Sequence, residues 1–259
     1  MNVLGVKVDN FSRQEMLDKI SDFLSEDKFH QIATVNPEFI LEAQKDEEFR
    51  NILNSCDLNI ADGMGIKLAF WRLGKKLKYR MAGIDLMREI LKITNEKKLK
   101  IFLAAKSGGL SNFEETKNAI LKIYPDLEIE GINMNCHSER LAKNPSISKQ
   151  DFLFNRSGSF VPLSGTQDDI KIRADVVFAN FGIPFQEKFL NSQKDGKIKL
   201  AVGVGGSFDY LTGKLKRAPK WMQFFGVEWL WRLILQPKRI KRIWNAVIIF
   251  PIKLIIKSK

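Results

Sequence analysis

The chain has 259 residues, of which 44% are hydrophobic, and its 42 Lys and Arg against 30 Asp and Glu give a formal net charge of +12. This length allows one full α/β domain with an appendage, and the composition is ordinary for a soluble protein. Residues 1–10 lack the basic start and apolar run of a signal peptide, and the longest apolar stretch, residues 243–256, is too short and interrupted to cross a membrane. Cys56 and Cys136 have no metal or redox spacing, which favours free thiols on the cytosolic side.

Helical and strand patterns alternate through the first hundred residues. Ser12 and Glu15 have the spacing of a capping box, which predicts a helix that continues to about Ser25. Pro37 suits the first turn of a helix that reaches about Asn54, with room for a break inside it. The other elements expected here are strands over residues 31–35 and 57–61 and helices over about 65–73 and 84–97.

The alternation continues beyond residue 100. Residues 111–114, Ser-Asn-Phe-Glu, form a second capping-box pattern, which predicts a helix to about Tyr124. Residues 133–166 show no clear period and are interpreted as a long loop or insertion. The other elements expected here are strands over residues 100–105, 127–132, 175–180 and 199–204 and a helix over about 185–192.

This order of elements predicts an α/β fold: a Rossmann-like, mostly parallel sheet with helices on both faces. We assign residues 1–210 to this core and residues 211–259 to a basic C-terminal appendage. Ligands of such sheets bind at the carboxyl ends of the strands. The loops after Val35, Ala61 and Asn180 are therefore the first places to look for a site.

The appendage carries almost all of the net charge. Residues 211–259 contain twelve Lys or Arg and one acid, Glu228, a net +11, and hold four of the five tryptophans. Apolar residues at 240, 243, 244, 247 and 248, with basic residues on a neighbouring stripe, predict an amphipathic helix. Basic and aromatic residues interleaved in this way suit an anionic membrane surface. A nucleic-acid-binding tail, a solvated charge run, or an apolar stripe packed on the domain are the alternatives.

Two strand-end loops offer polar residues. Thr34 and Asn36 lie where a strand passes into a helix, a place that suits a phosphate or sugar hydroxyls, although a structural cap is the commoner role. Asp62 follows the next strand, where a carboxylate can act as a general base, and a role as helix N-cap is equally open. Gly63 and Gly65 allow close approach of the backbone to a ligand.

Two further pairs of residues are candidates for ligand binding. Arg80 could neutralise a diphosphate, whereas Asp85 either contacts a ligand or caps its own helix. Gln186 could bind a sugar or a uracil edge, and Glu187 beside it could instead serve the helix dipole.

Residues 203–209, Gly-Val-Gly-Gly-Ser-Phe-Asp, form a glycine-rich loop at a strand end. The dinucleotide-binding spacing fails, because Asp209 stands near the place of the third glycine. We interpret the loop, with Gly205, as a point where a ligand approaches the backbone. No Asp-x-Asp pair occurs, and His30 and His137 are isolated, so the sequence predicts neither a metal site nor a cofactor.

Together these motifs resemble those of the bacterial WecG/TagA/CpsF glycosyltransferases. The resemblance covers about residues 3–242, and its most specific part is the run over residues 203–242. The residues that carry it are Thr34, Asn36, Asp62, Gly63, Gly65, Arg80, Gly83, Asp85, Gly182, Pro184, Gln186, Glu187, residues 203–206, Phe208, Asp209, Gly213, residues 217–219, Trp221, Glu228, Trp229, Arg232, Leu233, Pro237, Arg239 and Arg242.

The resemblance implies an inverting transfer of an N-acetylhexosamine, such as N-acetylmannosamine, from a UDP-sugar donor. The acceptor it implies is a sugar on an undecaprenyl-diphosphate carrier, in the synthesis of cell-surface polysaccharide or teichoic acid. It also implies a peripheral enzyme on the cytoplasmic face of an anionic membrane, with no required metal and no nucleic-acid partner, and it leaves room for a homo-oligomer.

By matched motif, the resemblance makes Asp62 the base that deprotonates the acceptor hydroxyl. It implies that Thr34, Asn36 and Gln186 hold sugar and that Arg217, Arg232 and Arg239 neutralise diphosphate. The other substrate-binding candidates are Gly63, Gly65, Arg80, Asp85, Glu187, Gly205 and Asp209.

Two rival interpretations belong to other classes of protein. The first is a nucleic-acid-binding protein that uses the basic tail, against which the near-neutral core and the Trp-rich and Ile-rich helix argue. The second is a nucleotide-dependent oxidoreductase, which the glycine-rich loop suggests and which NAD(H) or NADP(H) binding would reveal.

Overall fold

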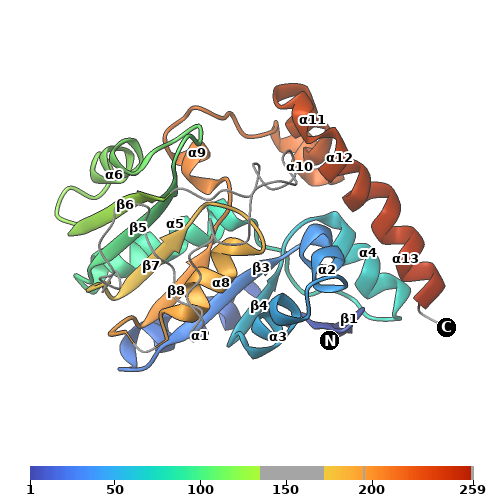
Figure 1. Cartoon of the computed structure of the whole chain (residues 1–259), viewed down its shortest axis with the longest axis horizontal. Coiled ribbons are helices and arrows are strands. Elements are labelled where there is room, and N and C mark those ends of the chain that lie inside the picture. Colours follow the sequence, from blue (N-terminus) through green and yellow to red (C-terminus); the bar gives the residue numbers. More distant parts are fainter. Residues whose placement is uncertain (135–171, 195, 258–259) are drawn as a thin grey trace, which may run out of the picture.

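Six parallel strands form the central sheet of the computed structural model, which describes residues 1–134, 172–194 and 196–257 (Figure 1). Their order across the sheet is β4-β3-β8-β7-β5-β6, and helices cover both faces, so the predicted α/β fold is confirmed. The strands are β3 (His30–Val35), β4 (Leu58–Ala61), β5 (Ile101–Lys106), β6 (Ile129–Met134), β7 (Val176–Ala179) and β8 (Leu200–Gly203).

The register brings the carboxyl ends of β4, β3, β8 and β7 to one edge of the sheet. Val35 of β3 pairs with Ala61 of β4, and Gly203 of β8 pairs with both Ala33 of β3 and Ala179 of β7. The loops that leave these strands therefore start side by side. β3 thus pairs with β8, a strand far away in the sequence.

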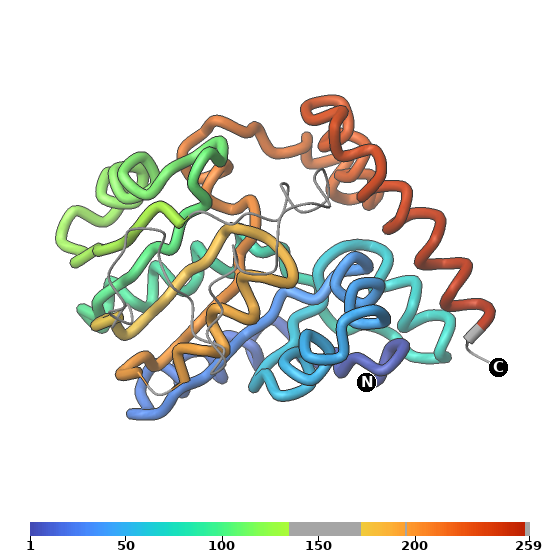
Figure 2. Tube along the Cα trace, in the orientation of Figure 1, coloured from blue at the N-terminus to red at the C-terminus, as the bar shows by residue number. Residues whose placement is uncertain are grey.

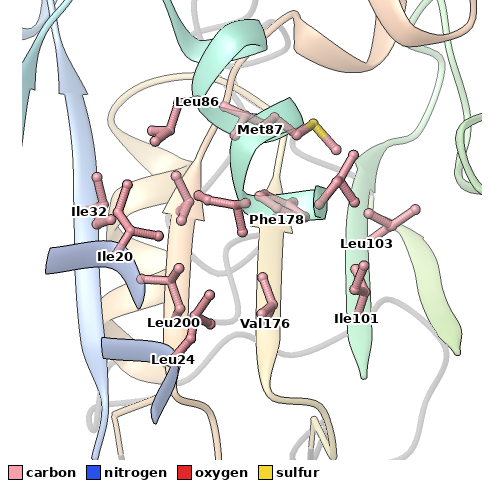
Figure 3. Packing of buried hydrophobic residues seen from close by; sticks show 14 of the residues in the cluster. Ile20, Leu24, Ile32, Leu86, Met87, Ile101, Leu103, Val176, Phe178 and Leu200 are labelled. Carbon is pink, nitrogen blue, oxygen red and sulfur yellow. The ribbon is translucent and has the colours of Figure 1, made fainter. Parts of the chain in front are cut away.

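One face of the sheet packs against α1, α5 and α6. Leu24 of α1 and Met87 of α5 lie with Ile32, Val176 and other strand residues in one buried cluster (Figure 3). Alternate strand residues point to this face, as the period of two in a strand requires. The helices involved are α1 (Arg13–Ser25), α5 (Gly83–Glu96), α6 (Phe113–Leu121) and the short α9 (Ser207–Leu211), which contributes Phe208.

The opposite face packs in two parts. Over β3 and β4 the buried cluster contains residues from α2, α3 and α4, and over β5, β7 and β8 it contains residues from α8. The bounds of these helices are α2 (Pro37–Ala43), α3 (Glu47–Ser55), α4 (Met64–Arg72) and α8 (Phe185–Ser192). The long helix expected from Pro37 is thus broken, and Asp46 caps its second half.

Several boundaries differ from the sequence-based expectation. The capping box of α1 is formed by Ser12 and Glu15 as predicted, but that of α6 is formed by Asn112 and Glu115, one residue later than expected. Asn133 and Met134, predicted to begin the long loop, belong to β6, and the rest of that stretch lies outside the described residues. An antiparallel hairpin of β1 (Asn2–Val3) and β2 (Val6–Lys7) was not predicted.

After α9 the chain forms a series of helices, the last of which pack beside α2 and α4 (Figure 2). They are α10 (Lys220–Phe225), α11 (Glu228–Leu235), η2 (Pro237–Arg239), α12 (Ile240–Trp244), η3 (Asn245–Ile249) and α13 (Phe250–Lys257). Phe250 and Leu254 of α13 are buried in the same cluster as Phe70 of α4. Within the described residues, no helix has both the length and the apolar character needed to cross a membrane.

Candidate functional site

A cavity of about 410 Å³ lies at the carboxyl edge of the sheet. Its walls come from the loops after β3, β4, β7 and β8 and from the C-terminal segment between α9 and α12. Ligands of parallel α/β sheets bind in this position. The sequence-predicted residues that line it are Thr34, Asn36, Asp62, Gln186, Gly205, Asp209, Arg217, Arg232 and Arg239.

Asp62 follows β4 and is partly exposed to the cavity. Burial raises the pKa of its carboxyl to about 6, with Glu228 and Asp85 adding to the rise and Arg80 opposing it. The N-cap of α4 is Gly63, which makes no side-chain cap, so Asp62 does not serve as that helix's cap. A carboxylate whose pKa lies near neutrality can accept a proton from a bound hydroxyl.

The two glycines after Asp62 act through the backbone and do not line the cavity. Gly63 has a φ of +84°, a conformation that side chains with a Cβ rarely adopt. A Cβ on Gly65 would lie 2.3 Å from Cγ of Pro37, the first residue of α2. These glycines therefore fix the turn that presents Asp62 and let α4 approach α2.

Thr34 and Asn36 both line the cavity and both have structural partners. The Thr34 hydroxyl donates to the carbonyl of Gly203 on β8 at 3.2 Å. Asn36 Oδ1 accepts from the backbone amides of Glu38 and Phe39, which makes Asn36 the N-cap of α2. The capping role that the sequence left open is thus present, and the side-chain NH₂ of Asn36 is the group left to donate to a ligand.

Gln186 and Glu187 open α8 and form a buried pair. Gln186 Oε1 accepts from the amide of Gly182 at 3.0 Å, and its Nε2 donates to Glu187 Oε1 at 2.6 Å. Glu187 is fully buried beneath the cavity and does not line it, and burial raises the pKa of its carboxyl to about 8. A Cβ on Gly203 would lie 2.4 Å from Glu187 Oε1, so the glycine makes room for this carboxyl.

Arginines from the C-terminal segment give one wall of the cavity its positive charge. Arg232 of α11, Arg239 of η2 and Arg242 of α12 all line it. Burial and the neighbouring Arg232 and Arg242 lower the pKa of Arg239 to about 10. Arg242 is paired with Glu38. Guanidinium groups crowded in this way favour an anion between them, because it would offset both the burial and the mutual repulsion.

Two ion pairs connect the C-terminal segment to residues next to Asp62. Arg217 makes a bidentate pair with Asp85 of α5, and Arg80 Nη2 lies 3.2 Å from Oε1 of Glu228 on α11. Arg80 and Asp85 therefore bind protein partners and do not line the cavity, whereas Arg217 and Glu228 do. Asp85 makes no side-chain cap for its helix.

Sequence reasoning gave no site role to several lining residues: Glu38, Lys106, Asn180, Tyr210, Glu228, Trp229 and Arg242. Glu228 stands out in the sequence as the one acid in a basic segment, and Glu228, Trp229 and Arg242 carry the family resemblance, but none of the three was given a role. Tyr210 and Glu38 have no distinguishing feature in the sequence, because only the folded chain brings them to the arginines. Among the residues described, no group of three or more His, Cys, Asp and Glu is placed to hold a metal ion.

Comparison with known proteins gives a consistent result over the whole chain. The model of the Glycosyl transferase WecG/TagA/CpsF family matches residues 1–259. A protein of Bacillus subtilis (strain 168) is 33% identical over 215 residues, which cover 82% of this chain and 73% of that protein. A protein of Staphylococcus aureus (strain MRSA252) is 27% identical over 257 residues, 98% of this chain and 91% of that protein.

Another relative, from Bacillus spizizenii (strain ATCC 23059 / NRRL B-14472 / W23), is 30% identical over 221 residues, 85% of this chain and 77% of its own. All three relatives are named N-acetylglucosaminyldiphosphoundecaprenol N-acetyl-beta-D-mannosaminyltransferase.

Proposed function

The chain belongs to the WecG/TagA/CpsF family of glycosyltransferases, and from this membership we propose that it moves an N-acetylhexosamine, in the first place N-acetylmannosamine, from UDP to a lipid-linked sugar. The proposed acceptor is N-acetylglucosamine on undecaprenyl diphosphate, as the names of the relatives suggest. The product would enter a cell-surface polysaccharide or teichoic acid. The observation that carries the proposal is one cavity that combines Asp62 from the core with arginines from the C-terminal helices.

Asp62 is the proposed base. The acceptor hydroxyl oxygen attacks the anomeric carbon of the donor from the face opposite UDP, and the bond between that carbon and the diphosphate oxygen breaks. The hydroxyl proton passes to the Asp62 carboxylate, and UDP leaves with the bonding pair. The raised pKa of Asp62 supports this role, because a carboxylate with an ordinary pKa near 4 is a much weaker base.

Arg232 and Arg239 are the proposed partners of the departing diphosphate. Arg239 is surrounded by Arg232 and Arg242, and Glu38 is already paired with Arg242. Positive charge placed before the reaction, where negative charge develops on the leaving group, lowers the barrier. Thr34, Asn36 and Gln186 stand on the core side, where they are proposed to hold the sugars.

The C-terminal helices are the proposed contact with the membrane. Ile240, Trp244, Ile248, Ile252 and Ile255 form an exposed apolar stripe along α12, η3 and α13. Exposed Lys238 and Lys241 flank its beginning. Each basic residue near an anionic leaflet contributes about 1 kcal/mol of attraction, and the stripe adds apolar burial. This arrangement supports a peripheral enzyme that meets its lipid-linked acceptor at the bilayer surface.

Neither the family match nor the named relatives support the nucleic-acid-binding alternative. The exposed apolar stripe also argues against it, because a nucleic-acid tail needs basic residues and not a row of isoleucines.

The proposal is tested by the release of UDP from purified full-length chain. The assay contains anionic lipid vesicles, a short-chain analogue of N-acetylglucosaminyl-diphospho-undecaprenol, and either UDP-N-acetylmannosamine, UDP-N-acetylglucosamine or UDP-glucose. Acceptor-dependent release with UDP-N-acetylmannosamine is the expected result, and release with another donor alone would correct the sugar. No acceptor-dependent release with any of the three donors would contradict the proposal.

A further inference from the structure

Glu228 holds a singular place in the C-terminal segment. It is the one acidic residue among the 49 residues from 211 to 259, and it lies in the first turn of α11. Its side chain is 29% exposed, lines the cavity, and contacts Arg80 Nη2 at 3.2 Å across a sequence separation of 148 residues. An acid at this position reduces the attraction of the segment for anions. The role of Glu228 therefore lies in its contact with the core residue Arg80.

The main chain keeps Arg80 close to Asp62. The amide of Met81, next to Arg80, donates to the carbonyl of Ala61 at 3.1 Å, and the amide of Asp62 donates to the carbonyl of Val35 at 2.8 Å. Both segments are therefore fixed at the carboxyl end of β4. Arg80 thus pairs with the carboxylate of Glu228 from α11, and its charge also acts on the carboxylate of Asp62 in the core.

We propose that Glu228 is a positioning residue for the transfer: by pairing with Arg80 it directs that guanidinium toward α11, which leaves Asp62 the stronger base. This inference rests on the proposed function in one respect, the role of Asp62. Glu228 contacts Arg80 and, through that arginine, acts on Asp62, the proposed proton acceptor.

The charges that face Asp62 decide the direction of the effect. They are Arg80 from the segment before α5, Asp85 from α5 and Glu228 from α11. Asp85 also raises the pKa of Asp62, but both of its carboxylate oxygens are engaged by Arg217. If Glu228 lost its charge, Arg80 would have Asp62 as its remaining acidic neighbour, and the carboxylate of Asp62 would be stabilised. The base would become weaker although its own side chain and its backbone were unchanged.

The test is a direct titration of Asp62 in the full chain. Protein labelled with ¹³C at the aspartate carboxyl carbons is titrated by NMR, and Asp62→Asn identifies the resonance. Glu228→Gln is expected to move the Asp62 titration to lower pH by about one unit, since an opposite charge within reach of a carboxyl lowers its pKa by about that much or more. Glu228→Asp keeps the charge and is expected to restore the titration toward that of the unaltered chain.

A matched control comes from the ion pair between Lys214 and Glu115. It also joins the C-terminal segment to the core, but Glu115 belongs to α6 and its pair does not include Arg80 or Asp62. Glu115→Gln removes the same kind of charge and keeps a residue that can complete the capping box. It is expected to leave the Asp62 titration where it was. An unchanged titration in Glu228→Gln, or an equal shift in Glu115→Gln, would overturn the proposal.

A second measurement separates this proposal from the proposed function. The acid limb of UDP release should move to lower pH in Glu228→Gln and stay in place in Glu115→Gln. If the unaltered chain releases no UDP, the proposed function fails, whereas the NMR titration still decides whether Glu228 acts on Asp62. A titration that shifts while the acid limb stays fixed would remove Asp62 as the base and would overturn the positioning role for the transfer.

Discussion

Arg232 of α11 and Tyr210 of α9 join the C-terminal helices to the core at the wall of the cavity. Nη1 of the arginine donates to the tyrosine hydroxyl, and the guanidinium carbon lies 4.9 Å from the centre of the ring. On the same side, a Cβ on Gly206 would come within 2.5 Å of Arg232 Nη2. Arg232 is thus held in place before any ligand enters, so little side-chain freedom is left to lose on binding.

This arrangement predicts the effect of removing the arginine charges. Arg232→Gln and Arg239→Gln should each weaken UDP binding and lower UDP release by at least about tenfold, because a charge-assisted contact to phosphate contributes roughly 1.5–3 kcal/mol. Calorimetric titration with UDP and the release assay measure the two effects. Lys238→Gln removes the same charge from an exposed neighbour that does not line the cavity, and it should leave UDP binding unchanged. Similar losses of UDP binding in all three variants would mean that net charge alone, and not these two positions, binds UDP.

The raised pKa of Asp62 predicts a pH-dependent rate. UDP release should fall about tenfold per unit below pH 6 and level off above it, because only the ionised carboxylate can accept the proton. Asp62→Asn should lower turnover by roughly 10²–10⁴-fold at pH 8 and leave UDP binding largely intact. Turnover retained in this variant would rule out Asp62 as the base.

Glu187 predicts a pH-dependent stability. Its pKa is raised from 4.5 to about 8 in the folded chain, so between these values the folded state binds more protons than the unfolded state. The free energy of unfolding should therefore fall as pH rises from about 4.5 to 8, by up to a few kcal/mol. Urea unfolding at pH 5 and pH 8.5 measures the fall.

Glu187→Gln should remove most of this pH dependence, and at pH 8.5 the variant should be more stable than the unaltered chain. Glu130→Gln, on the exposed side of β6, is the control and should unfold like the unaltered chain at both values. A pH dependence that persists in Glu187→Gln would mean that Glu187 is ionised in the folded state or that another buried group is responsible.

The last helix presents two apolar sides, and these should respond differently to substitution. Phe250 is fully buried against α4, whereas Ile252 is 48% exposed. Phe250→Ala should lower the free energy of unfolding by about 3 kcal/mol or more, and Ile252→Ala should have little effect. Trp244→Ser should reduce cosedimentation with anionic vesicles without loss of stability. If Phe250→Ala left stability unchanged, α13 would not be part of the folded core in solution.

The sheet was largely predictable from the sequence because its strands are buried runs in a regular alternation with helices. β3 and β8 begin and end within about one residue of the expected ranges, and the break between α2 and α3 was allowed for. The α6 capping box lies at Asn112 and Glu115, one residue later than expected, because the sequence offers two overlapping boxes. Ser111 with Glu114 has the same spacing as Asn112 with Glu115. The short α9, α10 and α11 depend on tertiary contacts more than on periodicity, and they were not predicted.

For the site, strand-end logic selected Asp62, Thr34 and Asn36, since parallel strands bring their carboxyl ends together. It could not reveal that Arg80 and Asp85 would be occupied by Glu228 and Arg217, because ion pairs over such separations have no local pattern. An amphipathic C-terminal helix was expected from its apolar spacing and its basic residues, but the inward packing of Phe250 and Leu254 stood only as an alternative.

The pairing of β3 with β8 also sets an order of events during synthesis. β3 is complete at Val35, yet one of its two neighbours in the sheet ends at Gly203. Until that partner has emerged, the growing chain exposes an unpaired edge of β3 and the apolar faces of α2, α3 and α4. Those apolar faces are completed only when Phe250 has emerged as well. Contacts of such long separation form slowly and leave partly made sheets prone to associate. The positive wall of the cavity is therefore the last part to be made, and a nascent chain can have Asp62 in place well before the arginines of that wall join it.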